Sequence, residues 1–295
     1  MIVVPEFFAE RLSRSEGDPA RAWLARLPDL VTEYTRRWAV RLDTVTPWHG
    51  YAGIALPGVR ADGTPVVLKL GYVGPETRDE PRALAAWQGN GAVLLHDSDI
   101  AEGAMLLERL DERRSLEGEP IAAAVPIIAT LLRRLAVPAP DGLTRDLRVE
   151  AERWATELPR DWERLGRPLP RRLLDAAVRV CRDHGPSAGD LLVNEDLHFE
   201  NVLAGAREPW LVIDPQPLRG DVEFTTLSIL WNRRDESTLD HRFAELVAVA
   251  GLDPERARAW TLVRAVQNWL WFVADGITDD FGRPAVQAIA PWAAR

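Results

Sequence analysis

The sequence predicts an α+β protein, with a small antiparallel-sheet lobe at residues 1–110 and a larger helical lobe at residues 111–295. Three observations favour this fold class. The chain of 295 residues exceeds the usual size of one domain, so either one large domain or two lobes are expected. Short β-rich segments separated by turn residues occupy the chain up to about Leu110. In the rest, apolar residues recur at three- and four-residue spacing, which is typical of helices.

The predicted sheet begins after Arg37. The Asp62–Gly63 pair in the segment RADGTP is typical of a hairpin turn between two of its strands. One helix interrupts the sheet at residues 79–87, where Pro81 stands near the helix start and apolar residues follow at helical spacing. The predicted strands are residues 38–46, 51–59, 65–71, 92–97 and 104–110.

The second lobe is predicted to be mostly helical, with a break at the segments LLV and WLVID, which read as strands. Gly185 is expected to end one helix, and the segment VPAPDG is expected to form a loop. The predicted helices are residues 120–135, 144–158, 171–185, 223–232, 242–251 and 255–276.

Charge and composition exclude several classes of function. The 36 basic and 45 acidic residues give a net charge of -9, which disfavours a nucleic-acid or anionic-membrane partner and favours a cationic small molecule. The single cysteine, Cys181, excludes an internal disulfide and a multi-cysteine zinc site, and is expected to be a small buried residue in a reducing compartment.

The apolar segments of the sequence disfavour secretion and a membrane span. Glu6 and Glu10 interrupt the pattern of a signal peptide, and the longest apolar run, PIAAAVPIIATLL, is too short to cross a bilayer. We therefore expect a cytoplasmic protein. The sequence carries no signal for its oligomeric state.

Lys69 is the only lysine among the 36 basic residues, and it stands in the apolar strand segment VVLKL. An ammonium is a compact point charge that can approach two phosphate oxygens, whereas a guanidinium is a broad planar fork. Lys69 is therefore a candidate phosphate ligand; the alternative is an edge-strand lysine that faces the solvent. Glu80, at the start of the predicted helix, either fixes the lysine as an ion pair or complements the helix dipole.

The segment LLVNEDLHFENVL places Asp196 and Asn201 five residues apart between two strand-like runs, and Asp214 follows the next strand. One carboxylate is a potential base, and the other two oxygen donors suit Mg²⁺. Such a set suffices for phosphoryl transfer, in which catalysis is mostly positioning and charge neutralisation. Each residue alone is a weak signal, because Asp and Asn are common in turns.

The segments NEDLHFEN and LVIDPQPLRGD resemble the His-Gly-Asp-x-x-x-x-Asn and Ile-Asp motifs of the aminoglycoside phosphotransferases, a kinase-like family that phosphorylates hydroxyls of small molecules. Within that family, AMLLERLDERRSL and EPRALAAWQGNGAVLLHD are most similar to the streptomycin 6-phosphotransferase and hydroxyurea phosphotransferase branch. The likeness covers roughly residues 40–232. It implies a two-lobed protein-kinase-like fold with ATP bound by residues 1–110, and catalysis and acceptor binding by residues 111–295.

The resemblance also implies individual roles. Asp196 is the expected catalytic base, and Asn201 and Asp214 are the expected Mg²⁺ ligands. Lys69 is expected to contact the α- and β-phosphates of ATP, with Glu80 orienting it. The remaining nucleotide contacts are expected from the backbone at Glu108, Arg109 and Leu110, which meets adenine, and from the loop between Gly50 and Gly53, which covers the phosphates.

Two positions depart from the family pattern. Asn194 stands where the family has a histidine two residues before the catalytic Asp, and Thr225 stands where it often has an aspartate. Both family residues brace the loop, and Asn and Thr also form hydrogen bonds with backbone groups. The departures therefore bear on rate and loop rigidity more than on the class of reaction.

Acidic residues near the loop are candidates for binding a cationic acceptor. The candidates are Glu200, Asp221 and Glu223, with Glu195 beside them, and the alternative for each is ordinary solvated surface. His198 is expected to have a structural hydrogen-bonding role; a metallohydrolase reading, with His198 as a metal ligand, has no support from the spacing of the other histidines.

Trp269 and Trp271 stand beside Asp275 in the last predicted helix, and the chain contains 12 tryptophans. Core packing is the favoured interpretation of this pair, and the alternative is a wall for a cationic ligand that includes Trp271 and Asp275.

The function predicted on these grounds is a kinase that transfers the γ-phosphate of ATP to a hydroxyl of an aminoglycoside, of streptomycin type, as in antibiotic resistance. Two alternatives stay open. The first is a kinase of another hydroxylated metabolite. The second is a catalytically silent kinase-like module that binds a nucleotide or a cation.

Overall fold

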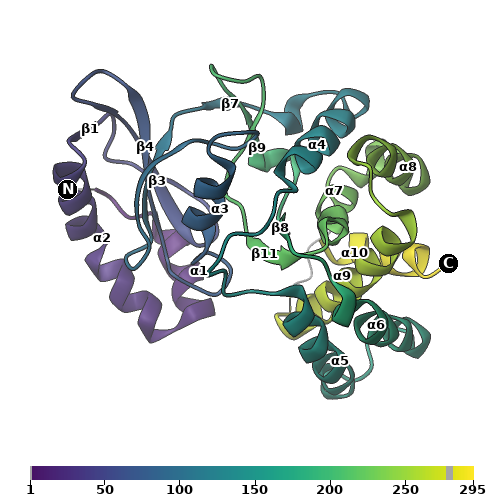
Figure 1. The fold of residues 1–295 in the computed structure, drawn as a ribbon. Coiled ribbons are helices and arrows are strands. Elements are labelled where there is room, and N and C mark those ends of the chain that lie inside the picture. Colours follow the sequence, from purple (N-terminus) through teal and green to yellow (C-terminus); the bar gives the residue numbers. More distant parts are fainter. Residues whose placement is uncertain (1, 277–281) are drawn as a thin grey trace. The chain divides into compact units, whose positions relative to one another are not determined.

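The computed structural model describes residues 2–276 and 282–295 (Figure 1). The chain forms two compact units. The N-terminal unit comprises Met1–Asp111 together with Gly205–Pro209, and the C-terminal unit comprises Glu112–Ala204 and Trp210–Arg295. A short segment from the second half of the chain thus completes the first unit.

An antiparallel sheet forms the centre of the N-terminal unit, as the sequence predicts. Its strand order is β1-β3-β4-β6-β5, and β2 pairs with β3. The predicted hairpin turn is confirmed, because Gly63 adopts φ +87° and the N–H of Thr64 donates to the Asp62 side chain at 2.9 Å. The strands are β1 (Val40–Leu42), β2 (Trp48–His49), β3 (Gly53–Arg60), β4 (Pro65–Gly71), β5 (Leu95–Asp99) and β6 (Ala104–Glu108).

Lys69 lies on a central strand. In β4 it pairs with Ala55 of β3 on one side and with Met105 of β6 on the other. The alternative of a lysine on an edge strand is therefore wrong. The predicted helix is confirmed as α3 (Glu80–Trp87), which starts at Glu80 with Pro81 in its first turn.

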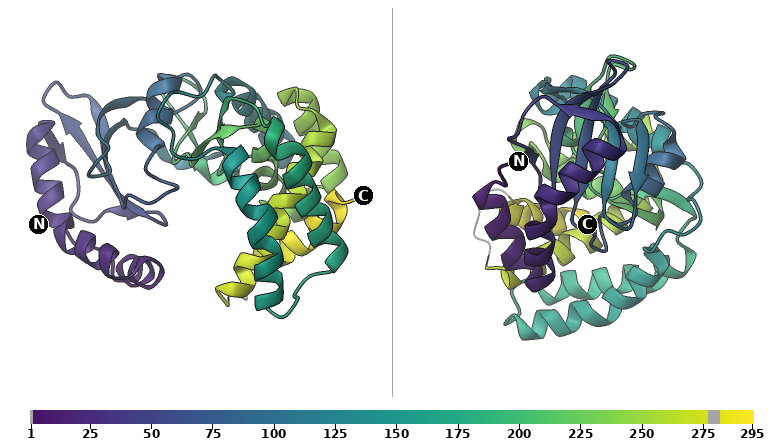
Figure 2. Two further views of the ribbon diagram at one scale, coloured as in Figure 1. Left: turned by 60° about the horizontal axis from the view of Figure 1, so that its bottom comes forward. Right: turned by 90° about the vertical axis from the view of Figure 1, so that its left-hand side faces the viewer.

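Two helices, α1 (Glu6–Glu16) and α2 (Asp18–Arg37), precede the sheet and are not among the predicted elements. The buried residues of α2 recur at helical spacing, with Trp23, Leu27 and Leu30 among them. Together with Phe8 of α1 they form one core with apolar residues of β3 and β4. In Figure 2 these two purple helices lie against the sheet.

Helices make up most of the C-terminal unit, as predicted. They are α4 (Ile121–Leu135), α5 (Leu147–Arg164), α6 (Arg171–His184), α7 (Thr226–Trp231), α8 (Leu239–Ala250), α9 (Pro254–Ala274) and α10 (Gly282–Ala293). α10 has no counterpart in the sequence analysis, and the segment expected as a helix from residue 223 begins with a 3₁₀ turn, Val222–Thr225. Gly185 follows α6 directly, which confirms the predicted helix end.

Short strand pairs connect these helices. β8 (Leu191–Asn194) pairs with β11 (Pro217–Gly220), and β9 (Val202–Ala204) lies between β10 (Leu211–Val212) and β7 (Asp111–Ser115). The segment between β8 and β9 carries the candidate catalytic residues, and β10 leads to Asp214.

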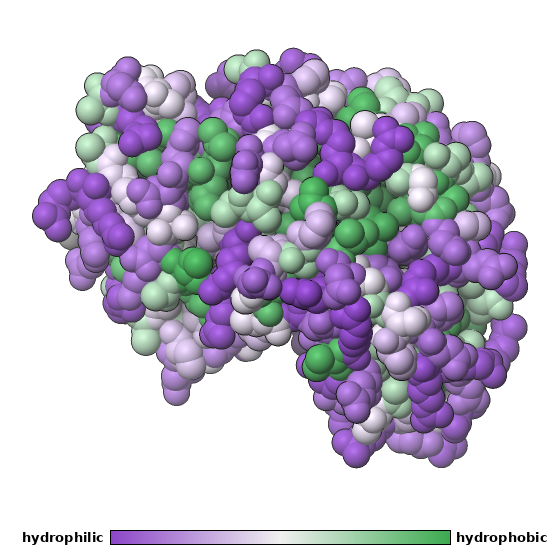
Figure 3. Space-filling view, in the orientation of Figure 1, coloured by the Kyte–Doolittle hydropathy of each residue, from purple (hydrophilic) through white to green (hydrophobic). Residues whose placement is uncertain are grey.

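The helical core contains Cys181, which is 2% exposed; its burial raises the pKa of the thiol to about 12. The predicted role of a small buried residue is confirmed. Hydrophilic residues dominate the face of the molecule in Figure 3, with apolar residues dispersed among them. Across the described ranges, none of the helices combines the length and apolarity that crossing a membrane requires.

Candidate functional site

The N-terminal unit contributes an ion pair between the lone lysine and α3. Nζ of Lys69 donates to Oε1 and Oε2 of Glu80 at 2.6 and 2.7 Å. The side chains of Lys69 and Glu80 are only 13% and 5% exposed, so solvent screens the pair little. The ion pair therefore joins β4 to the first residue of α3, across 11 positions of the sequence.

Gly50 and Gly53 form the two ends of the loop between β2 and β3, in which the N–H of Gly50 donates to the carbonyl of Gly53 at 3.0 Å. A side chain at position 53 would place its Cβ 2.9 Å from the carbonyl oxygen of Leu70 and 3.1 Å from Cα of Gly71. Close strand packing therefore explains Gly53 without reference to a ligand. The phosphate-covering role of this loop stays a prediction.

The segment Glu108–Leu110 lies at the end of β6. Its side chains are engaged within the N-terminal unit: Glu108 accepts from the N–H of Leu94 at 3.1 Å and from Arg207 at 3.0 Å, and Arg109 donates to Asp43 at 2.6 Å. Leu110 is buried. The role predicted for this segment uses its backbone, and these side-chain bonds hold that backbone in place.

The C-terminal unit brings Asp196 and Asn201 together, as predicted from their spacing. Nδ2 of Asn201 donates to the backbone carbonyl of Asp196 at 3.1 Å and to its Oδ2 at 3.3 Å. Nε2 of Gln216 lies 3.5 Å from the same Oδ2. The Asp196 carboxylate is nevertheless 36% exposed, so it is accessible from the solvent.

Asp214 follows β10 with φ +50°, a left-handed conformation that few non-glycine residues adopt. The preceding residue, Ile213, donates its N–H to the carbonyl of Asn201 at 2.9 Å. The backbone of Asn201 is thereby bonded to the residue that precedes Asp214.

Asn194 and Thr225 stabilise the backbone of the loop that carries Asp196. Oδ1 of Asn194 accepts the N–H groups of Asp196 and Gln216, both at 3.1 Å, and Oγ1 of Thr225 donates to the carbonyl of Asn194 at 2.8 Å. Asn194 and Thr225 are 2% and 0% exposed. The expectation that both departures from the family pattern still bond backbone groups is confirmed.

Further braces escaped the sequence analysis. The carbonyl of Glu195 accepts hydrogen bonds from Ser228 of α7 at 2.5 Å and from Arg264 of α9 at 2.7 Å, while its carboxylate pairs with Arg145. The peptide that leads into Asp196 is therefore fixed from two helices. One signal was available in the sequence, since Arg264 is a charged residue within the apolar run TLVRAVQNWL.

Two of the acidic candidates are not surface residues. Glu195 and Asp221 are 6% and 7% exposed. Asp221 accepts from Gly189 N–H at 2.7 Å, from Arg256 at 2.5 Å and from Trp260 Nε1 at 2.7 Å. The prediction that Asp221 binds the acceptor is wrong, because the core of the unit already uses both of its oxygens.

The other acceptor candidates remain accessible to varying degrees. The Glu200 side chain is 66% exposed, Glu223 accepts from the N–H of Asp253 at 3.1 Å, and Trp271 is 43% exposed. Asp275 is exposed directly after α9. Trp269 is 8% exposed, which confirms core packing for that residue.

His198 is mostly buried between two carboxylates, with Nε2 3.7 Å from Asp196 and Nδ1 3.8 Å from Glu200. Burial lowers the pKa of His198, although the nearby charges of Glu200 and Asp214 act in the opposite direction. Within residues 2–276 and 282–295, no three His, Cys, Asp or Glu side chains gather as a metal-binding set.

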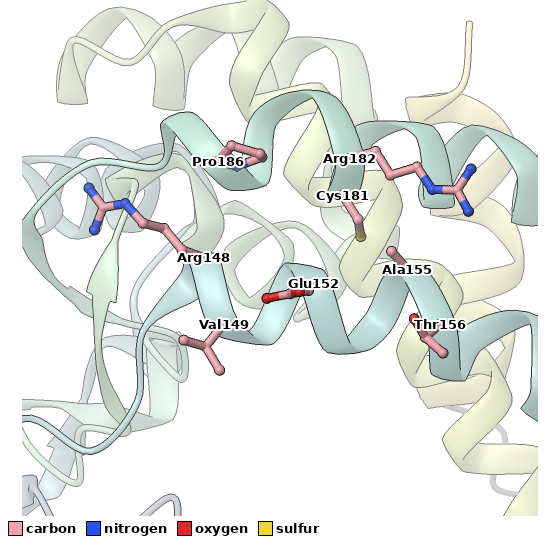
Figure 4. Close-up of a pocket in the computed structure, with 8 residues that line it drawn as sticks. All are labelled: Arg148, Val149, Glu152, Ala155, Thr156, Cys181, Arg182 and Pro186. Carbon is pink, nitrogen blue, oxygen red and sulfur yellow. The ribbon is translucent and has the colours of Figure 1, made fainter.

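A pocket with a volume of about 560 Å³ lies between α5 and α6, and Figure 4 shows the side chain of Cys181 projecting from α6 toward α5. None of the predicted site residues lines it. Its lining residues are Arg148, Val149, Glu152, Ala155, Thr156, Cys181, Arg182 and Pro186.

Comparison with known proteins gives one family over most of the chain. The family model described as "Aminoglycoside/hydroxyurea antibiotic resistance kinase" matches residues 37–276. A hydroxyurea phosphotransferase of Kitasatospora aureofaciens is 44% identical, with 94% of this chain and 82% of the relative covered. A streptomycin 6-kinase of Streptomyces griseus is 41% identical, with 94% and 93% covered.

Solved structures confirm the predicted fold class. An aminoglycoside phosphotransferase in complex with ADP and hygromycin B superimposes with a TM-score of 0.61 at 15% identity, covering 88% of this chain and 97% of the other. The choline kinase of Streptococcus pneumoniae gives 0.59 at 13% identity, covering 91% and 99%. The chain therefore has the protein-kinase-like fold of these enzymes.

Proposed function

Because the chain belongs to the aminoglycoside/hydroxyurea antibiotic resistance kinases, we propose that it transfers the γ-phosphate of ATP to a hydroxyl of a streptomycin-type aminoglycoside. The observation that carries the proposal is the geometry of Asp196. Its carboxylate is partly exposed, yet Asn201 and Gln216 orient it and several braces fix its backbone. A base held in this way needs little rearrangement to reach its reactive position.

In the proposed reaction, Asp196 accepts the proton of the acceptor hydroxyl as that oxygen bonds to the γ-phosphorus. The bond between this phosphorus and the bridging oxygen of ADP breaks, and ADP leaves with the electron pair. Asn201 keeps the carboxylate of Asp196 in position through its Nδ2.

The N-terminal unit supplies the nucleotide contacts in this proposal. Lys69 binds the α- and β-phosphates, and Glu80 holds its ammonium by both carboxylate oxygens. The Gly50–Gly53 loop covers the phosphates, and the backbone of Glu108–Leu110 meets the adenine. Residues 1–110 thus serve the nucleotide, and residues 111–295 serve catalysis and the acceptor.

The donor set also fits a magnesium ion. Asn201 uses its amide nitrogen on Asp196, which leaves the amide oxygen as a donor of the kind that Mg²⁺ prefers, and Asp214 adds a carboxylate. When bound, the ion neutralises charge on the phosphates. A backbone hydrogen bond from Ile213 to Asn201 keeps the segments that carry Asn201 and Asp214 next to each other.

A cationic acceptor fits the charge of the protein. The net charge of -9 attracts guanidinium groups, and Glu200, Glu223, Trp271 and Asp275 are the acceptor contacts that we retain. We also propose a cytoplasmic location, which the requirement for ATP and the single free cysteine, Cys181, support.

Hydroxyurea is a second candidate acceptor, because the relative that is 44% identical is a hydroxyurea phosphotransferase. The two candidates differ in charge: streptomycin carries guanidinium groups and hydroxyurea is neutral. Added salt should therefore weaken the attraction between the acidic protein and streptomycin, and should leave the binding of neutral hydroxyurea unchanged.

The test is a transfer assay with γ-labelled ATP and Mg²⁺ across streptomycin, other aminoglycosides, hydroxyurea and neutral sugars, with mass spectrometry of the products. We expect phosphorylated streptomycin and a KM for it that rises with ionic strength. The matched control is Asp196→Asn, which keeps the size of the side chain and removes the base. Phosphorylation of hydroxyurea or a neutral sugar without any of streptomycin would contradict the acceptor assignment, and binding without turnover would favour a silent module.

A further inference from the structure

A guanidinium group from α1 binds the Gly50–Gly53 loop. Arg11 donates from Nη2 to the backbone carbonyls of Gly50 and Tyr51, the latter at 2.9 Å. Its Cζ also lies 4.7 Å from the centroid of the Tyr51 ring, within the range of a cation–π contact. One side chain thus holds two successive carbonyl groups and one ring of the same loop.

Helix α1, which carries Arg11, is packed against the rest of the N-terminal unit. Phe8 is fully buried, with its ring centroid 6.4 Å from that of Trp23 in α2 and 5.7 Å from that of His49 in β2. Ahead of the helix, the N–H of Val3 donates to the carbonyl of Val45 at 3.1 Å. Residues 3–11 therefore contact Val45 and His49, which flank Trp48, in addition to the Gly50–Gly53 loop.

These contacts bear on any anion that approaches the loop. Backbone carbonyl oxygens carry partial negative charge and repel phosphates, whereas a guanidinium bound to them offsets that charge and keeps them directed at α1. A loop held in one conformation before binding also loses less conformational entropy when the ligand arrives. Both effects act on the affinity for a nucleotide and neither acts on the acceptor.

We propose that Arg11 is a positioning residue for the nucleotide, through which α1 holds the Gly50–Gly53 loop in its phosphate-binding conformation. The proposal rests on the proposed function, since the phosphate-covering role of the loop is part of it. It gives the N-terminal helix a role in nucleotide affinity in addition to its role in the core.

The experiment compares Arg11→Ala with Arg14→Ala, a control on an exposed arginine one turn further along the same helix. Nucleotide affinity is measured directly by displacement of a fluorescent ATP analogue, and KM and kcat are measured for both substrates. We expect Arg11→Ala to weaken nucleotide binding and raise the KM for ATP about three- to tenfold, where tenfold corresponds to about 1.4 kcal/mol. The kcat and the KM for the acceptor should stay within about twofold of the wild type, and Arg14→Ala should match the wild type throughout.

Arg11→Lys provides a second measurement that does not depend on the folding of the alanine variant. It keeps the charge but loses the planar fork, so an intermediate affinity is expected. Nucleotide affinity in both Arg11 variants equal to that of Arg14→Ala would overturn the proposal, and so would parallel losses for ATP and acceptor. If the wild type binds the analogue but transfers no phosphate, the proposed function fails while the affinity comparison still decides the role of Arg11. Absence of any nucleotide binding by the wild type would overturn both.

Discussion

Nζ of Lys69 lies within 2.7 Å of both carboxylate oxygens of Glu80, and the two side chains are only 13% and 5% exposed. We expect Lys69→Arg to lower kcat/KM almost as far as Lys69→Ala, by about 100-fold or ~2.7 kcal/mol. The guanidinium keeps the charge but is too broad for a site built around an ammonium. The control is Arg60→Lys at the exposed end of β3, and near-normal kcat/KM in Lys69→Arg would reduce Lys69 to a structural cation.

Asp196 and Asp214 should fail in different ways. Asp196→Ala removes the proposed base and should retain affinity for Mg²⁺-ATP within about threefold while turnover is lost. Asp214→Ala removes a proposed metal ligand, so its nucleotide affinity should no longer respond to Mg²⁺. Calorimetric titration of each variant with and without EDTA tests this difference, and equal losses of nucleotide binding would contradict both assignments.

Asn194 serves as an acceptor for two N–H groups, which gives a graded prediction. Asn194→His restores the residue found in the family and keeps an acceptor nitrogen, so kcat should change by less than tenfold, or about 1.4 kcal/mol. Asn194→Leu leaves two part-buried N–H donors without this acceptor, which should cost up to about 1–3 kcal/mol of unfolding free energy for each. A gain of several hundredfold in kcat for Asn194→His would show that the natural chain is an impaired kinase.

Asp221 is predicted to affect stability and leave acceptor binding unchanged. Asp221→Asn leaves Arg256 without its buried partner, which should cost about 3–5 kcal/mol in urea unfolding. At temperatures where the variant is folded, its KM for streptomycin should equal that of the wild type. Asp235→Asn, at a residue 89% exposed in a surface ion pair, is the control and should change little. A raised KM without loss of stability would restore the acceptor role of Asp221.

His198 should make the protein sensitive to acid. Burial holds its pKa below the ordinary value of about 6.5, so the unfolded chain binds this proton more readily than the folded chain does. The stability that neutral His198 allows is therefore present above pH ~6.5 and is lost as the pH falls below that value. His198→Gln should remove part of this loss. The test is urea unfolding of both proteins at several pH values from about 5 to about 7.5. Parallel curves for the two proteins would contradict the assignment.

Local patterns predicted much of the fold. The hairpin at Asp62–Gly63 and the helix at Glu80 depend on turn chemistry and short-range spacing, which a sequence carries explicitly. The first 36 residues carry the same helical spacing, with Trp23, Leu27 and Leu30 on the buried side of α2, so this helix was predictable from the same kind of signal. α10 follows directly on residues that lie outside the described ranges.

Residue spacing also predicted which groups meet in the candidate site, but it could not predict their surroundings. Asp196 and Asn201 are close in sequence, and Lys69 stood out by its composition. By contrast, the partners of Asp221 lie 32 to 39 positions away, on other elements, so the sequence could not distinguish a buried carboxylate from a solvated one. The same holds for Arg264, which reaches Glu195 across 69 positions.

The return of Gly205–Pro209 to the N-terminal unit has a consequence for how the protein is made and how it evolves. Arg207 donates to the carbonyls of Gly89 and Ala92 and to the carboxylate of Glu108. The N-terminal unit therefore cannot form these hydrogen bonds until the ribosome has synthesised residues 205–209. At about 5–20 residues per second, the first lobe waits several seconds for its last piece. A single crossover between related genes near residue 111 would likewise join Glu108 to an Arg207 region from another parent. Exchange of whole lobes therefore requires two further crossovers, and inheritance of the lobes as separate modules is disfavoured.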